Sequence, residues 1–135
     1  MPCDFKGGKK MKTKMNDLEV NVTEVLVKLG YPANLKGYYH LRAAIQFVVM
    51  DVRMIENITK QLYKKVAEQY STTIGSVDRS IHNAIDVIWE RANKELLEKY
   101  FYYCVNIKKH PPTNGEFIAA IADSIRLEMK MKEFE

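Results

Sequence analysis

Residues 59–90 read TKQLYKKVAEQYSTTIGSVDRSIHNAIDVIWE, and their pattern decides the fold. The stretch predicts a short helix, a tight polar turn and a long second helix over about 74–90. Apolar residues recur at helical spacing in the second helix and predict a buried face: Val77, Ile81, Ala84, Ile85 and Ile88. The opposite face is polar and carries Gly75, Arg79, His82, Asn83, Asp86 and Glu90, with Ser76 near its edge. The long helix is therefore amphipathic.

Two interpretations fit this helix pair. Arginine and asparagine can make paired hydrogen bonds to guanine and adenine edges, and a reader helix that follows a helix and a turn is the arrangement of a helix-turn-helix. An ordinary amphipathic helix pair with a solvated face fits as well, because such pairs are common in all-α domains. Periodicity alone favours this second interpretation.

Length and composition predict one soluble globular domain. The chain has 135 residues, of which 47% are hydrophobic and 28% charged, as in ordinary globular proteins. It contains no apolar run of about 18 residues and no signal-peptide core at its start, so we expect a cytoplasmic protein with no membrane partner. Cys3 and Cys104 are expected to be free thiols.

The net charge of +4 comes from the first residues of the chain. Residues 1–15 hold five lysines against Asp4, and the remaining 120 residues hold 16 basic and 16 acidic groups. We therefore expect a flexible basic tail or linker over 1–15 and a helix-turn-helix domain over 16–135. Because that domain is neutral, net charge gives no support for DNA binding.

The rest of the chain predicts four more helices, which makes the fold all-α with six helices. They are expected over 17–29, 37–56 and 94–100, and from the capping box of Thr113 and Glu116 to about Met131. In the helix expected over 37–56, Val52 and Ile55 are predicted to lie on the core face. The aromatic run at 101–105 is expected to be a packed connector, with at most one short extended piece.

No motif for catalysis, metal binding or a cofactor is present in the sequence. His40, His82 and His110 are far apart and have no ligand partners at metal spacing. There is no glycine-rich phosphate loop or nucleophile elbow. A cysteine in a hydrophobic run such as Cys104 is usually a core residue. We therefore expect no enzyme activity, no metal and no cofactor.

Five stretches resemble one known family over nearly the whole chain after about residue 18. They are GYPANLKGYYHLRAAI, NITKQLY, AEQYSTT, VDRSIHNAIDVIWERAN and PPTNGEFIAAIADSIRLE. They are similar to the C-terminal effector domain of stage zero sporulation protein A, the master response regulator of endospore formation. The last stretch is the most specific, because helix-turn-helix periodicity alone is generic.

The resemblance implies six helices, with the third and fourth forming a helix-turn-helix that binds double-stranded DNA as a sporulation transcription regulator. It implies homodimers on tandem sites, and contact with the RNA polymerase sigma factor through the segment that follows the reader helix, here about 91–103. The family also has an N-terminal receiver domain, which these 135 residues lack. The chain is thus expected to be a truncated effector domain or a stand-alone paralogue that aspartyl phosphorylation cannot switch.

The family's base-reading motif, R-V-E-R-A-I-R-H, aligns with residues 76–83. Here only its second arginine remains, as Arg79, while Ser76, Asp78, His82 and Asn83 replace its other polar positions. The resemblance implies that Arg79 reads a guanine and that the other four residues lie in or beside the groove, where Asp78 can accept from a cytosine amino group. Ser76 cannot make the paired guanine contact, which typically contributes about 1–3 kcal/mol of base discrimination. Position alone predicts phosphate contacts by Lys60, Lys64, Lys65 and Thr72. Lys64 stands where the family commonly has a proline. The first helix of the helix-turn-helix is therefore expected to be continuous with residues 59–63.

A second function therefore stays open at this point. A paralogue with a neutral domain and a lost arginine could have stopped reading DNA and act through protein contacts, with a sigma factor or a full-length relative. Selection of DNA from random sequence distinguishes the two functions.

Overall fold

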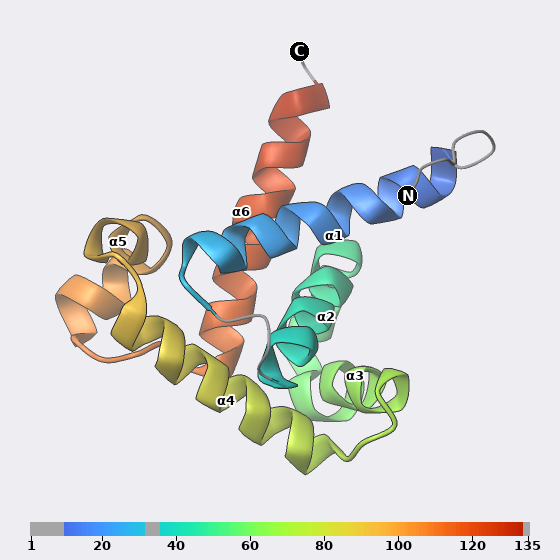
Figure 1. The fold of residues 1–135 in the computed structure, drawn as a ribbon, viewed down its shortest axis with the longest axis horizontal. Helices are drawn as coiled ribbons and strands as arrows, with labels where there is room; N and C mark the ends of the chain where they lie inside the picture. The colour runs from blue at the N-terminus through green and yellow to red at the C-terminus, as the bar shows by residue number, and fades with distance from the viewer. Residues whose placement is uncertain (1–9, 32–35, 134–135) are drawn as a thin grey trace.

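The described part of the chain folds into six α-helices and three short helices of other types (Figure 1). The computed structural model describes residues 10–31 and 36–133. The α-helices are α1 (Lys10–Lys28), α2 (Lys36–Met50), α3 (Lys64–Gln69), α4 (Ile74–Arg91), α5 (Lys94–Tyr102) and α6 (Asn114–Glu133). A 3-10 helix, η1 (Val52–Asn57), and two π-helices, η2 (Ile58–Tyr63) and η3 (Tyr103–Lys108), lie between them. None of the described residues forms a strand, and the predicted all-α fold with six helices is confirmed.

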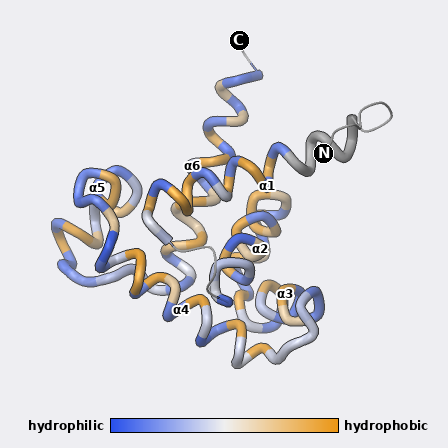
Figure 2. Tube along the Cα trace, in the orientation of Figure 1, coloured by the Kyte–Doolittle hydropathy of each residue, from blue (hydrophilic) through white to orange (hydrophobic). Residues whose placement is uncertain are grey.

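Helix α2 lies at the centre of the core, because α1, α4 and α6 all pack against it. Its Leu41, Ile45 and Val48 are buried, as predicted. All five apolar residues predicted for the buried face of α4 are buried as well. Figure 2 shows hydrophobic and hydrophilic residues alternating along α4 and α6, as amphipathic helices require. Each large apolar side chain buried in this way stabilises the fold by about 1.5–3 kcal/mol.

The first helix starts earlier than predicted. Its backbone is helical from Lys10, so the predicted start at Asp17 was wrong. Its end near Gly30 was predicted correctly: Gly30 has a φ of 84°, and the N–H groups of Gly30 and Tyr31 donate to earlier carbonyls. Residues 1–9, most of the predicted basic tail, lie outside the described residues. A domain boundary after residue 15 stays a prediction.

The second helix ends earlier than its apolar pattern predicted. It stops at Met50, and Asp51 adopts an extended backbone while its carboxylate accepts a hydrogen bond from the N–H of Arg53. This cap starts η1 in a new direction. Val52, predicted on the core face, is 47% exposed, and Ile55 is only partly buried. The predicted single helix over 37–56 was wrong because a local aspartate cap overrides the apolar periodicity.

The turn before α4 is held by local hydrogen bonds. Ser71 adopts the left-handed conformation with a φ of 52°, and the N–H of Thr72 donates to the carbonyl of Ala67 at 2.9 Å. Ser71 thus takes the place of the glycine that usually ends such helices. Thr73 caps α4, because its hydroxyl accepts from the N–H of Ser76 at 3.1 Å. Tyr63 and Lys64 both have right-handed helical backbones, so η2 runs into α3 without a break, as predicted.

The aromatic run after α5 is helical. Phe101 carries a kink, with φ −133° and ψ 44°, and η3 follows directly. The sequence predicted a packed connector here with at most one short extended piece, and among the described residues this run forms helix and pairs with no strand. The predicted capping box is confirmed: the N–H of Thr113 donates to Glu116 at 2.9 Å, and the N–H of Glu116 donates to the Thr113 hydroxyl at 3.1 Å.

Candidate nucleic-acid interface

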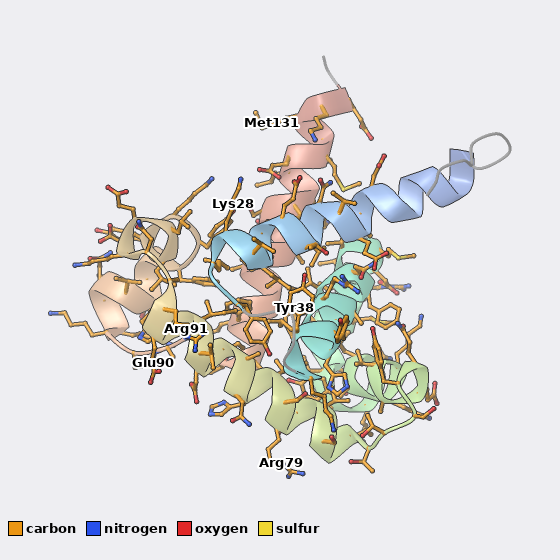
Figure 3. All side chains as sticks on the ribbon, viewed as in Figure 1. Lys28, Tyr38, Arg79, Glu90, Arg91 and Met131 are labelled. Carbon is orange, nitrogen blue, oxygen red and sulfur yellow. The ribbon has the colours of Figure 1, made fainter. Side chains whose placement is uncertain are left out.

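Arg79 lies in the middle of the exposed face of α4. Successive residues of a helix are about 100° apart, which puts position 79 opposite the buried stripe. Figure 3 shows its side chain extending from α4 away from the other helices. Asn83 and Asp86 are exposed on the same face, one and two turns further along. A guanidinium held on the outside of a well-packed helix can reach the edge of a base.

Ser76, Arg79 and Asn83 lie together beside the start of α2. They line a shallow hollow of about 300 Å³ that Lys36 and Gly37 close from the other side. Gly37 permits this close approach, because a Cβ there would collide with the carbonyl oxygen of Ser80. Three of the five predicted base-reading residues are thus brought onto one surface.

Asp78 lies on the other flank of α4 and faces α6. Its carboxylate oxygen Oδ1 accepts a hydrogen bond from the amide Nδ2 of Asn114 at 3.1 Å, and that nitrogen lies 3.2 Å from the Asp78 carbonyl. The structure does not bring Asp78 together with Ser76, Arg79 and Asn83. Asn114 was not among the predicted site residues, and no local pattern could reveal it because 36 residues separate the two.

His82 is exposed and pairs with Asp86 one turn later. The distance from its Nε2 to the carboxylate is 3.5 Å. Glu90 continues the acidic surface on the second half of the helix. The face of α4 therefore changes along its length, with Arg79 and His82 in the first half and carboxylates in the second. In a helix-turn-helix, the N-terminal half of the reader helix contacts base edges.

The three predicted phosphate-binding lysines share a different surface. Lys60, Lys64 and Lys65 line a wide hollow of about 830 Å³ with residues of η1, and no residue of α4 lines it. The ammonium of Lys65 lies 5.0 Å from the centre of the Phe47 ring. Acidic residues also line this hollow, namely Asp51, Glu56 and Glu68. Thr72, the fourth predicted contact, is partly buried in the turn before α4.

A buried histidine on α2 contacts α4. His40 is 3% exposed, and its Nδ1 lies 2.6 Å from the hydroxyl of Ser80 on α4. The ring packs against Tyr70 with 5.2 Å between centroids. Burial, with a smaller effect of Lys36, lowers the pKa of His40. This polar link to α4 could not be predicted from the sequence, because the two residues are far apart in the chain.

The titratable groups outside α4 form no metal-binding cluster in the part of the chain that the structure describes. Among the described residues, no three His, Cys, Asp or Glu side chains are grouped to hold a metal ion. Cys104 is buried, and burial followed by the charge of Glu116 raises the pKa of its thiol. A thiol held protonated in this way is a poor nucleophile.

An all-α domain in which a short helix, a tight turn and a capped amphipathic helix follow one another is a helix-turn-helix domain. The family model described as "Sporulation initiation factor Spo0A C terminal" matches residues 22–125, which is most of the chain. The chain belongs to this family of sporulation response-regulator effector domains, in which DNA binding and transcription regulation are established. No helix in the described ranges is long and apolar enough to cross a membrane.

Proposed function

We propose that the chain is a sequence-specific transcription regulator that places the N-terminal half of α4 in the major groove of double-stranded DNA. The observation that carries this proposal is Arg79, exposed at the centre of the outer face of a helix whose opposite face is buried. Arginine paired with the O6 and N7 atoms of guanine is the commonest specific contact in the major groove.

The neighbours of Arg79 have complementary roles in this proposal. Asn83 lies one turn further on the same face and can form paired hydrogen bonds with an adenine. The hydroxyl of Ser76 can hydrogen-bond to a base edge or to a phosphate. His82 lies beside Arg79, near the rim of the groove. Lys60, Lys64, Lys65 and Thr72 are proposed phosphate contacts, which position the domain without reading sequence.

The proposed function includes a contact with the RNA polymerase sigma factor. The family resemblance assigns the sigma-factor contact to about 91–103, and two exposed tyrosines lie there, at the end of α5 and the start of η3. Tyr102 is 62% exposed and Tyr103 58% exposed. Exposed aromatic residues are typical anchors of protein interfaces. Homodimers on tandem DNA sites are part of the same proposal.

The test compares Arg79→Ala with a matched control on the same helix. A DNA site selected by the wild-type chain is changed one base pair at a time, and affinity is measured by fluorescence anisotropy at fixed salt. Arg79→Ala is expected to abolish discrimination at one guanine, a loss of roughly 5- to 150-fold. Arg91→Ala removes the same charge at the far end of α4 and should leave that discrimination intact. Unchanged discrimination in Arg79→Ala would remove Arg79 from the reading set.

One observation favours a second function, a paralogue that acts through protein contacts alone. Asp86 and Glu90 share the exposed face with Arg79, and the domain after residue 15 has no net positive charge. Carboxylates on this face repel phosphates. In this alternative, random-sequence selection recovers no motif, whereas α5 still binds a sigma factor.

A further inference from the structure

One amide group connects three helical elements, η2, α4 and α6. The Nδ2 of Asn114, the first residue of α6, lies 3.0 Å from the hydroxyl of Tyr63, 3.2 Å from the carbonyl of Asp78 and 3.1 Å from its carboxylate. Tyr63 ends η2 and Asp78 belongs to the first turns of α4. The amide therefore joins the element before the reader helix, the reader helix itself and the last helix.

The orientation of this amide is fixed by charge. The Asp78 carbonyl and carboxylate can only accept hydrogen bonds, so the NH₂ group must face them. The opposite orientation would point the amide oxygen of Asn114 at two acceptors. The oxygen instead faces the interior, and among the described residues it is buried without a hydrogen-bond partner. Because an unpaired buried oxygen is unfavourable, its presence indicates that the contact to Asp78 dominates.

The position of Asn114 is set by its surroundings rather than by Asp78. The reciprocal bonds of Thr113 and Glu116 fix the first turn of α6, and Lys108 also donates to Glu116 at 2.9 Å. At the next residue, Gly115, an added Cβ would lie 2.7 Å from the side chain of Ile58. The start of α6 is therefore pressed against η2, and Asn114 presents its amide from a rigid base.

Tyr63 responds to the same carboxylate. Burial raises the pKa of Tyr63 to about 12, the hydrogen bond from Asn114 opposes this, and the negative charge of Asp78 adds to the rise. The hydroxyl thus stays protonated at ordinary pH and accepts from Asn114. Asp78 is exposed, but its Oδ1 is bound to Asn114 of α6, and Asp78 does not line the hollow shared by Ser76, Arg79 and Asn83.

We infer that Asn114 is a positioning residue for the reader helix and that Asp78 is the anchor it holds, so base discrimination rests on Arg79 and its neighbours and not on Asp78. The inference rests on the proposed function, because it states which residues of that site specify DNA sequence. The family resemblance had assigned Asp78 a base contact.

The substitution Asp78→Asn separates the two roles. An asparagine oxygen can still accept from Asn114, so the anchor is largely kept. A base-reading carboxylate changed to an amide would instead shift preference from a cytosine toward an adenine. We expect Asp78→Asn to select the wild-type motif from random DNA, and Asp78→Ala to bind every sequence more weakly by a similar factor. A changed base preference at one pair in Asp78→Asn would overturn the inference.

A second measurement without DNA keeps the inference testable if no motif is selected. Asp78→Ala, Asn114→Ala and the double variant are melted thermally, with Asp86→Ala as the control carboxylate on α4. Each of the first two is expected to lower the melting temperature by about 3–6 °C. The double variant should lose clearly less than the sum, because the residues act as a pair. Additive losses would disprove the anchor, whereas coupled losses without any selected motif would disprove the proposed function alone.

Discussion

At the scale of single residues, Ser71 has a backbone conformation that is unfavourable for any residue except glycine. It adopts a left-handed backbone, with a φ of 52°, just after the end of α3. Gly30 has the same left-handed conformation after the end of α1, where a glycine adopts it without strain. We expect Ser71→Gly to stabilise the domain by about 0.5–1 kcal/mol, because glycine adopts this conformation freely but loses more entropy on folding. Chemical denaturation measures the change. Ser71→Ala is the control and should not stabilise; a destabilised glycine variant would contradict this interpretation of the turn.

Residues also show where prediction from sequence reached its limit. The exposed position of Arg79 and the capping box of Thr113 and Glu116 could be predicted, because helical spacing and caps are local patterns. The contact of Asn114 with Asp78 could not, since it joins residues that only the folded chain brings together. Periodicity had left Asp78 off the polar face, although Asp78 is exposed, and only the family alignment placed it among the base-reading residues.

At the scale of elements, the pairing of α2 with α4 depends on a neutral histidine. His40 is buried against Ser80 and Tyr70, with Lys36 as the nearby charge, and its pKa is lowered. A histidine whose pKa is depressed by folding stabilises the fold above its unfolded pKa, and that stability is lost as pH falls through the folded value. We expect the melting temperature to fall between about pH 7 and pH 5. His40→Asn, whose amide can replace Nδ1, should lose part of this dependence; identical pH profiles would contradict the role.

The element after the reader helix carries a separate prediction. We expect Tyr102→Ala and Tyr103→Ala together to reduce transcription from a target promoter while DNA affinity stays within about twofold, because both side chains lie on α5 and η3 rather than on the face of α4. In vitro transcription and anisotropy measure the two effects. Val20→Ala on α1, also exposed, serves as a control. Loss of DNA affinity in the tyrosine variant would place this segment in the DNA interface instead.

The helices could be predicted where apolar periodicity was the only strong signal. Prediction failed where a second signal, such as a helix cap, competed with the periodicity. The five buried residues of α4 follow its periodicity without exception. In α2 the apolar pattern continued past Met50, but Asp51 supplied a cap that ended the helix. The aromatic and β-branched residues at 101–105 favoured an extended chain by propensity. The run instead continues into η3 with a kink at Phe101, while Phe101 and Cys104 are buried in the core, which is tertiary packing overriding a local preference.

At the scale of the whole molecule, neutrality after residue 15 makes DNA binding depend on local charge. If Lys60, Lys64 and Lys65 contact phosphates, each lysine-to-alanine substitution should weaken binding to all sequences alike. Each should also reduce the slope of log affinity against log salt by about 1. Lys130→Ala, on the C-terminal part of α6 that projects from the bundle (Figure 1), is the control. Slopes that equal the wild-type value in all three lysine variants would move the phosphate contacts elsewhere.

We propose that this domain still reads DNA sequence and does so through Arg79. The most direct measurement is selection from random double-stranded DNA by the purified chain at moderate salt, run in parallel with Arg79→Ala. The predicted result is a short motif containing one guanine that the variant no longer requires. Recovery of no motif by the wild-type chain, or of the same motif by both proteins, would contradict the claim.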